Sequence, residues 1–289
     1  RDVVLSGGAI NTPQLLMLSG IGPADHLREV GVDVVHDLPG VGAGLQDHPL
    51  VPVVSNVRSG KSLRLAESPV NLALWKALGR GPLTSNLAES GLFTRSSPEL
   101  AEPDLQFHFL PVKFWKQAEI DPDVEAFSSL VVLVRVHSRG SVRLRSADPT
   151  WAPAIDAGYL TDERDLEALV SGVEQSREIT SSGPIAQVLD GEWSPGPAVQ
   201  GRDALRASVK ETLESLYHPV SSCRMGSDDR AVLDSQLRVR GIEGLRVADA
   251  SAMPTLVRGN TNAPTIMIGE RAADLLPGRT ATQELTPTR

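Results

Sequence analysis

Few of the side chains capable of acid–base or nucleophilic chemistry lie close enough to one another in this sequence to form a site within one short segment. The six histidines never lie three to five residues apart, so no zinc-binding pair falls within one helix or turn. No G-x-S-x-G nucleophile elbow occurs, and the single cysteine, Cys223, has no C-x-x-C partner. The pairs Gly20–Gly22 and Gly40–Gly42 do not extend to G-x-G-x-x-G and are predicted to be turn glycines. The residues therefore predict no metal site and no hydrolase of that type.

In two parts of the sequence, His, Asp and Asn residues lie among glycines and prolines. A purely structural role explains these two motifs poorly. The first is the segment 8–22. The second combines Tyr217-His218-Pro219, Asp249-Ala250-Ser251-Ala252-Met253-Pro254 and Gly259-Asn260-Thr261-Asn262-Ala263-Pro264-Thr265. An imidazole can take a proton near neutral pH, and an amide can donate a hydrogen bond without losing a proton. Structural alternatives are a core histidine at 218, turn-forming asparagines at 260 and 262, and a capping Asp249.

The elements that must position these motifs begin with α/β character. A strand at 3–5 turns at 6–9 into a helix, with Pro13 predicted at its first helical position and Asn11 or Thr12 as its cap. A short strand at 32–36 and a glycine-rich loop at 38–44 follow. Near the end, a strand at 245–248 leads to Asp249, and Pro264 opens a last helix. This alternation favours an α/β unit.

The middle of the chain has a different pattern of predicted strands and helices from the two ends. Strands are predicted at 105–110 and 130–136, the latter forming a hairpin through 138–140 with 142–144. Apolar residues at helical spacing predict two helices, one capped by Asp162 and one running directly into Tyr217. The apolar positions that define these helices are Leu166, Leu169, Val170 and Val173 in the first, and Leu205, Val209, Leu213 and Leu216 in the second. A mixed or antiparallel α+β domain from about 50 to about 205 is therefore expected.

The composition of the chain argues against several classes of protein. The chain has 289 residues with 28 basic and 36 acidic side chains, a net charge of −8 that argues against nucleic-acid binding. The longest uninterrupted apolar run, 130–134, is five residues long, so no membrane span is predicted. One cysteine fits a reducing compartment, and a cytoplasmic location is expected. Arg1 stands where an initiator methionine would, and a strand begins at once, so the chain is expected to be a piece of a longer protein.

Together the motifs resemble the glucose–methanol–choline (GMC) flavoprotein oxidoreductases, in particular their choline dehydrogenase-like branch. Segment 8–22 is similar to that family's second signature, and the motifs at 217–219, 249–254 and 259–265 resemble its catalytic and flavin-side segments. Gln46-Asp47-His48-Pro49, Gly81-Pro82-Leu83-Thr84-Ser85-Asn86 and Ser138-Arg139-Gly140-Ser141-Val142 also match in order. The resemblance covers nearly the whole chain and identifies it as the C-terminal portion of such an enzyme.

The resemblance implies an α/β plus α+β fold, in which a partial FAD-binding, Rossmann-like domain carries an inserted substrate-binding domain with a mixed or antiparallel sheet. Residues 1–50 are expected to be the first remaining part of the FAD-binding domain. Residues 51–205 would form the substrate-binding domain. Residues 206–289 would complete the FAD-binding domain and carry the catalytic residues.

The resemblance also assigns roles to single residues. His218 would be the catalytic base and Asn260 its companion. Tyr217 and Glu89 would contact substrate; Glu89 resembles a carboxylate that binds the quaternary ammonium of choline in one branch, although a solvated or structural Glu89 is the plainer alternative. FAD would be the cofactor. The residues expected to bind it are Asp249, Ala250, Asn262, Ala263, Pro264 and Thr265.

The function expected is the oxidation of a small-molecule alcohol by hydride transfer to FAD, with oxygen or another acceptor taking the electrons. Two alternatives remain open at this point. A non-redox enzyme of the same fold, like the related hydroxynitrile lyases, would use His218 for acid–base chemistry alone. A catalytically incomplete fragment would lack the dinucleotide-binding segment that the resemblance places before this chain.

Overall fold

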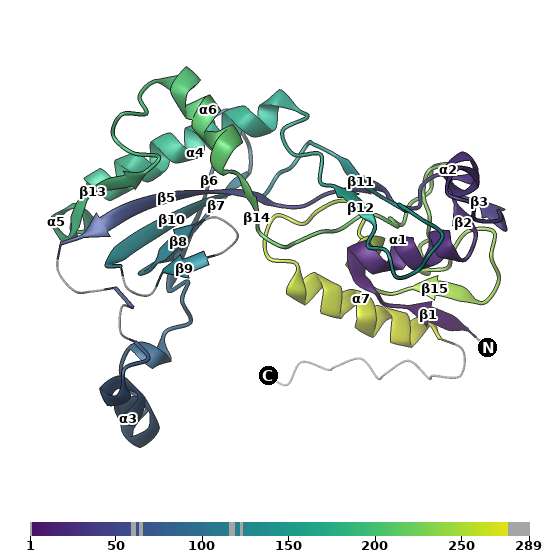
Figure 1. The fold of residues 1–289 in the computed structure, drawn as a ribbon, viewed down its shortest axis with the longest axis horizontal. Helices are drawn as coiled ribbons and strands as arrows, with labels where there is room; N and C mark the ends of the chain where they lie inside the picture. The colour runs from purple at the N-terminus through teal and green to yellow at the C-terminus, as the bar shows by residue number, and fades with distance from the viewer. Residues whose placement is uncertain (1, 59–61, 64–65, 116–118, 122–123, 277–289) are drawn as a thin grey trace. The chain divides into compact units, whose positions relative to one another are not determined.

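The computed structural model describes residues 2–58, 62–63, 66–115, 119–121 and 124–276 (Figure 1). The chain divides into two compact units. Unit 1 comprises 1–47, 138–161 and 217–289, and unit 2 comprises 48–137 and 162–216. The expected domains 1–50, 51–205 and 206–289 put 138–161 in the middle domain, whereas the structure groups these residues with unit 1. The reason is strand pairing, because the strands within 138–161 pair with one another and with β4 (Ala43–Leu45).

In its described residues, unit 1 is built from short parallel and antiparallel strand pairings and the three α-helices α1, α2 and α7. β1 (Val3–Leu5) lies parallel to β15 (Leu245–Val247), with Val3 opposite Leu245, and this confirms both predicted strands. The remaining elements are β2 (Ile21–Gly22), α2 (Ala24–Glu29), β3 (His36–Asp37), β11 (Gly140–Arg143), β12 (Ala154–Asp156), η3 (Ala250–Ala252) and α7 (Asn262–Leu275). β12, β11 and β4 form a three-stranded antiparallel sheet. α1 (Gly8–Leu18) covers it through Ala9, which packs with buried Leu45 and Val142.

α1 begins five residues before the predicted first position, and Pro13 lies inside it. The prediction of an Asn11 or Thr12 cap was wrong because Asp249, distant in sequence, accepts a hydrogen bond from the amide of Gly8 at 3.0 Å. A proline at position 13 has no N–H for the carbonyl of Ala9. The hydroxyl of Ser222 replaces that donor, at 2.5 Å from the Ala9 oxygen. The helix therefore tolerates the proline without an orphaned carbonyl.

Unit 2 is an antiparallel sheet in the order β13-β5-β10-β7-β6, with β14 paired to β5. Its strands are β5 (Pro49–Val57), β6 (Ser90–Thr94), β7 (Leu105–Leu110), β10 (Ala126–Leu133), β13 (Leu189–Ser194) and β14 (Glu214–Ser215), and β8 (Lys113–Trp115) and β9 (Glu119–Asp121) form a separate hairpin. Its helices are α3 (Pro69–Leu78), η1 (Pro82–Thr84), α4 (Glu163–Ser181), α5 (Ile185–Val188) and α6 (Arg202–Thr212). The antiparallel sheet and the Asp162 cap of α4 confirm those predictions.

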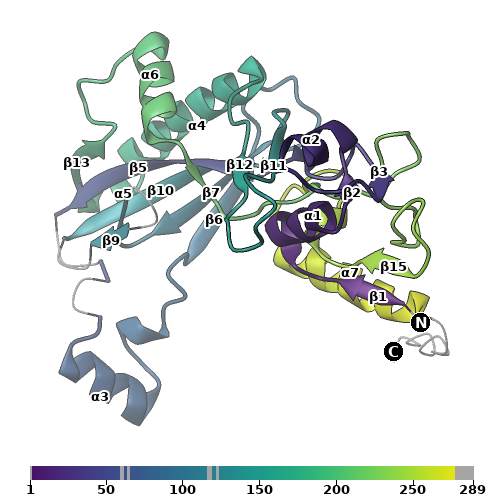
Figure 2. The same cartoon turned by 45° about the vertical axis from the view of Figure 1, so that its right-hand side comes forward.

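Helix α4 and the sheet make the core of unit 2 on one face (Figure 2). Gly172 lets the helix come close, because a Cβ there would lie 2.3 Å from a methyl of Val131 on β10. The other face buries a cluster formed by Leu50, Leu110, Val112, Phe114, Leu130, Val132 and Val134. Two apolar layers thus bury the central strands β5 and β10 on both sides.

Two expectations for the middle of the chain were wrong. The predicted hairpin between 130–136 and 142–144 does not form, because β11 pairs with β4 and β12 in unit 1. The second predicted helix stops at Thr212 rather than reaching Tyr217. Leu213 adopts an extended conformation, and Glu214 and Ser215 pair with Leu50 and Pro49 on β5. Among the described residues, no helix is long and apolar enough to cross a membrane.

The contact between Ser222 and α1 gives a test of the fold. Replacing Ser222 by Ala should lower the free energy of unfolding by about 1–3 kcal/mol, because the buried Ala9 carbonyl then has no donor. In a Pro13→Ala background the amide of residue 13 can donate instead, so the same substitution should cost less. Urea denaturation of the four proteins in this double-mutant cycle measures the difference.

Ser221 is the matched control for this cycle. It is buried next to Ser222, but its hydroxyl has no hydrogen-bond partner among the described residues. Ser221→Ala should therefore leave the free energy of unfolding nearly unchanged. An equal loss for both serines, or no rescue by Pro13→Ala, would contradict the proposed compensation.

Candidate active site

His218 is held in place by its own backbone. Tyr217, the residue before it, has φ +61°, a left-handed conformation that non-glycine residues rarely adopt. The amide of His218 donates to Oδ1 of Asp47 at 2.7 Å. This hydrogen bond to Asp47 fixes the backbone directly after the left-handed residue Tyr217. The imidazole itself is half-buried, whereas Tyr217 is 63% exposed.

The segment after His218 is paired on both edges. On one edge, Gln46 and Val220 exchange two backbone hydrogen bonds of 3.1 and 2.9 Å. On the other, the amides of Ser221 and Cys223 donate to the carbonyls of Ala250 and Ser251 at 3.3 and 3.0 Å. The loop that carries His218 is therefore bonded to Gln46 on one side and to η3 on the other, and its position depends on both neighbours.

Gln46 and Asp47 connect this loop to two further segments. Tyr159 donates its hydroxyl to Oδ2 of Asp47, so each oxygen of this buried carboxylate has a donor. Oε1 of Gln46 accepts from the hydroxyl of Thr255 and from the amide of Leu256, both at 3.1 Å. The sequence motif Gln46-Asp47-His48-Pro49 was noticed only as part of the family resemblance. No role was assigned to Gln46, Asp47 or Tyr159, and their contacts with residues more than 100 positions away could not be found from spacing.

The surroundings of His218 favour the neutral form of its side chain. Burial lowers the pKa of His218 below its ordinary value of 6.5, and the carboxylate of Asp47 opposes that shift only in part. Burial thus favours the unprotonated form of the imidazole, the form that can accept a proton. A group in this state can serve as a general base.

Asp249 is buried and bonded within the protein. Its Oδ2 accepts from the amide of Gly8 at 3.0 Å and from the hydroxyl of Thr12 at 2.6 Å. Its Oδ1 accepts from the amide of Ser251 at 2.7 Å and so caps η3. The structure thus gives Asp249 the capping role named as its structural alternative, and places Ala250 in the turn that it shapes. Nearby, burial and the charge of Asp249 raise the pKa of the Cys223 thiol, which makes this cysteine inert.

Asn260 and the start of α7 form an exposed, polar end of unit 1. Asn260 lies in the turn before the helix, and Asn262 and Ala263 are its first, exposed residues. Pro264 is the third helical residue, not the first as expected, and its ring leaves that position without a donor. Among the residues that the structure describes, no side chain caps this N-terminus, and its first turn contains no acidic residue. The positive end of the helix dipole is therefore available to an anionic group.

The structure brings most of the sequence-predicted site residues into unit 1. His218 and Asp249 lie on the two paired segments described above, and Tyr217, Ala250 and the residues 260–265 flank them. Glu89 is the exception, because it belongs to unit 2, where it is exposed immediately before β6. Within the described part of the chain, no group of three or more His, Cys, Asp or Glu side chains could hold a metal ion.

Comparison with known proteins identifies the family. Residues 1–50 match the N-terminal model, and residues 136–269 the C-terminal model, of the GMC oxidoreductases. The chain therefore belongs to the GMC oxidoreductase family, which confirms the resemblance seen in the motifs.

The relatives include enzymes with named substrates. An alcohol dehydrogenase [acceptor] of Pseudomonas putida is 44% identical over 280 residues, which cover 95% of this chain and 51% of that protein. The human mitochondrial choline dehydrogenase is 44% identical over 289 residues, covering 97% of this chain and 48% of the relative. The chain spans about half the length of these relatives.

Solved structures agree with the fold. A formate oxidase of Aspergillus oryzae, described together with its FAD, superimposes with a TM-score of 0.88 at 28% identity, covering 95% of this chain and 54% of that one. A pyridoxine 4-oxidase gives 0.84 at 29% identity, covering 96% and 52%. The predicted fold class, a partial FAD-binding domain with an inserted sheet domain, is confirmed, as is FAD as the cofactor of the family.

The link between Asp47 and His218 gives a prediction about protonation. Replacing Asp47 by Asn removes a negative charge that favours the imidazolium, while the Asn oxygen can still accept from the His218 amide. The pKa of His218 should therefore fall further below its ordinary value. An NMR titration of the imidazole protons measures it, with no cofactor or substrate required.

Tyr159→Phe is the matched control, because it removes the other hydrogen bond to Asp47 but keeps the carboxylate charge. It should not lower the pKa of His218. An unchanged His218 pKa in Asp47→Asn, or the same fall in both variants, would show that the charge of Asp47 does not reach the imidazole.

Proposed function

We propose that this chain supplies the catalytic and substrate-binding residues of an FAD-dependent oxidoreductase that acts on alcohols. The observation that carries the proposal is His218, a half-buried imidazole whose pKa is lowered by burial and whose backbone amide is bonded to Asp47. The named relatives in its family include alcohol and choline dehydrogenases. Unit 1 would provide the flavin side of the site.

Alcohol oxidation sets a demand on the protein's own groups. An imidazole with a pKa near 6.5 and a hydroxyl with a pKa near 15.7 differ by about 9 units, so free alkoxide formation would cost about 12 kcal/mol. Burial lowers the pKa of His218 and widens this gap. His218 therefore takes the hydroxyl proton only as the hydride leaves the neighbouring carbon, and Asn260 donates a hydrogen bond to the oxygen while it carries negative charge. Bound FAD would supply the hydride acceptor.

The N-terminus of α7 would hold the flavin. The exposed amides of Asn262 and Ala263 and the uncapped helix end suit a group that becomes anionic when reduced, and the dipole would stabilise it by about 0.3–2 kcal/mol. Pro264 and Thr265 complete this turn. Ala250 would contact the cofactor from the end of β15, and Asp249 would act mainly by fixing the turn in which Ala250 lies.

The substrate is proposed to be a small-molecule alcohol. Tyr217, which is largely exposed beside His218, would contact it. Glu89 would contact the substrate if that substrate carries a positive charge, like the choline named in the human relative. Oxygen or another acceptor would take the electrons, and the cytoplasmic location stays a prediction based on the single cysteine. Nothing in the comparisons supports the lyase alternative.

The role of His218 predicts a kinetic defect. In a full-length enzyme that contains this chain, His218→Ala should slow flavin reduction by an alcohol about 10²–10⁴-fold, the usual contribution of a general base. FAD content should stay near normal. Stopped-flow absorbance under anaerobic conditions measures the rate, and unchanged reduction kinetics would remove His218 from the mechanism.

Asn260→Ala is the companion variant. If its amide bonds the oxygen most strongly as charge develops, kcat should fall and KM should change little, with a loss of about 2.7–4 kcal/mol in transition-state stabilisation. An effect confined to KM would instead assign Asn260 to ordinary substrate binding.

The two-stranded parallel sheet of unit 1 predicts how the 289-residue chain behaves alone. Parallel sheets are normally longer and covered on both faces, yet Val3 on β1 and Ile266 and Met267 on α7 are more than half exposed. The sequence also has no G-x-G-x-x-G to hold the cofactor's diphosphate. We expect the isolated chain to retain less than stoichiometric FAD and to aggregate through its strand edges. Gel filtration with flavin absorbance tests this, and a monodisperse peak carrying one FAD per chain would refute it.

A further inference from the structure

Helix α3 is apolar along most of its length, yet none of its residues is buried. Seven of its ten residues are Val, Leu, Ala or Trp, and Asn71 and Lys76 are its two polar ones. Val70 is 77% exposed, Leu78 65% and Trp75 45%. In both views of the chain, α3 lies apart from the sheet of unit 2 (Figure 1 and Figure 2). A helix that is apolar on most sides is normally covered by another surface.

Local signals set where α3 begins and ends. The hydroxyl of Ser68 accepts from the amide of Asn71 at 3.4 Å and caps the helix, and Pro69 is its first residue. Gly79 ends the helix in a left-handed conformation, with φ +61°, and its amide donates to the carbonyl of Trp75 at 2.8 Å. A ten-residue helix is still marginal in water by itself. A surface that covers its apolar side would therefore stabilise it.

The apolar side chains of α3 include a stripe along one face. Val70, Leu74 and Leu78 follow one another at four-residue spacing, and Trp75 lies three residues before Leu78. Leu74 is half-buried because the chain turns back on it at Gly81, where a Cβ would lie 2.9 Å from a Leu74 methyl. The rest of the stripe is open. It is about 12 Å long, at the rise per residue of an α-helix.

The charged side chains around this stripe are all basic. Residues 68–88 contain Lys76 and Arg80 and no Asp or Glu, in a chain whose net charge is −8. Both cations are exposed, and no ion pair joins either of them to a carboxylate that the structure describes. Helical spacing places Lys76 on the face opposite Leu74, and Arg80 follows the end of the helix. The patch formed by α3 and Arg80 is therefore apolar on one side with a positive border.

We propose that α3 docks this protein onto the surface of an anionic lipid bilayer. An interfacial helix buries its apolar face at the boundary between headgroups and acyl chains, and nearby Lys and Arg side chains attract acidic headgroups. Trp75 suits that depth, because an indole has an apolar ring and a polar N–H. With ten residues, about 15 Å, α3 can lie in this boundary but is too short to span a bilayer.

Charge favours lipid over a second copy of the chain as the covering surface. Two copies of α3 packed against each other would bring Lys76 and Arg80 close to the same cations of the partner, and like charges repel. Acidic headgroups would instead offset both cations. The proposed alcohol oxidation uses none of these side chains, so the two proposals stand or fall separately.

Co-sedimentation with lipid vesicles tests the docking, in a full-length enzyme that contains this chain. Vesicles made of equal parts of phosphatidylcholine and phosphatidylglycerol should bind the enzyme. Lys76→Gln combined with Arg80→Gln should weaken this binding about 25-fold, at about fivefold for each charge lost. Arg135→Gln combined with Lys210→Gln, at two exposed basic residues elsewhere in unit 2, is the matched control and should leave binding unchanged.

A second pair of variants tests the apolar contact. Trp75→Ser should weaken binding to the mixed vesicles about tenfold or more, because the indole no longer leaves water on docking. Its Tm and kcat without vesicles should stay unchanged, since the side chain is exposed in the free protein. Trp151→Ser replaces a tryptophan of unit 1 that is 56% exposed, and this matched control should bind the vesicles like the unsubstituted enzyme.

Three results would overturn the proposal. The first is no binding to the mixed vesicles, or equal binding by all variants. The second is a lower Tm for Trp75→Ser in an enzyme that does not bind vesicles, which would mean that another part of the full-length protein covers α3. The third is a dimer in gel filtration without lipid that Trp75→Ser converts to a monomer, which would assign α3 to a second copy of the chain.

Discussion

The geometry of unit 1 depends on the hydrogen bonds that the Asp249 carboxylate accepts. This buried carboxylate lies directly after β15 and bonds to the first amide of α1, to Thr12 within that helix and to the amide of Ser251. A carboxylate at a helix N-terminus is favoured by the dipole as well as by the individual hydrogen bonds. The same contacts shape η3, whose carbonyls accept from the amides of the segment that follows His218. The position of the candidate base thus rests on a charge that never touches it.

The sequence predicted the elements well where local pattern decides structure. The strands at 3–5 and 105–110 and the Asp162-capped helix formed as expected, because their apolar spacing and caps are local signals. The errors came where a distant partner decides. α1 starts at Gly8 because Asp249 accepts its amide, and α6 ends early because Glu214 and Ser215 pair with β5. β11 leaves the expected hairpin for the same kind of reason, a better partner in β4.

The candidate site shows the same division. Motif resemblance pointed to His218, Asn260 and the start of α7, because these residues lie in short segments with recognisable neighbours. It gave no role to Asp47 or Tyr159. Asp47 accepts from Tyr159 across 112 positions and from the His218 amide across 171 positions. A single Asp in a Gln46-Asp47-His48 motif carries no spacing signal for such a partner. Long-range hydrogen bonds of this kind are specified by the fold as a whole.

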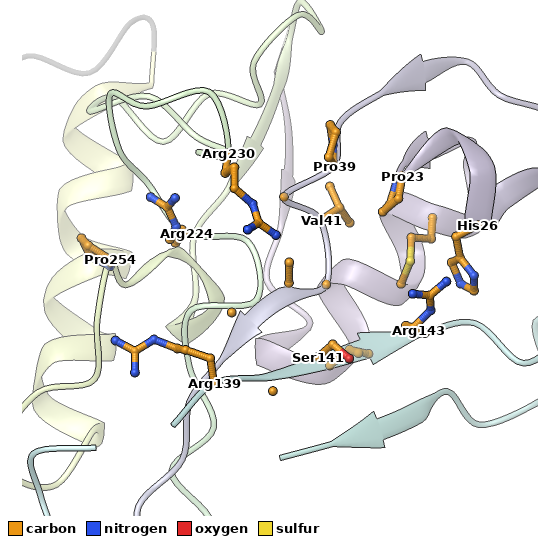
Figure 3. Close-up of a pocket in the computed structure, with 17 residues that line it drawn as sticks. Pro23, His26, Pro39, Val41, Arg139, Ser141, Arg143, Arg224, Arg230 and Pro254 are labelled. Carbon is orange, nitrogen blue, oxygen red and sulfur yellow. The ribbon is translucent and has the colours of Figure 1, made fainter. Parts of the chain in front are cut away.

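Helix α1 connects the two charged regions of unit 1. Its N-terminus is held by Asp249, and Met17 in its last turn, about 14 Å further along the helix, lines a cavity that Arg143 and Arg224 also line (Figure 3). The dipole is positive at the Asp249 end and negative at the cavity end. Its last turn has no basic residue, and the backbone amide of Ser19 caps its final carbonyls. One helix thereby stabilises the buried Asp249 carboxylate at its N-terminus and contributes Met17 to a cavity wall at its C-terminus.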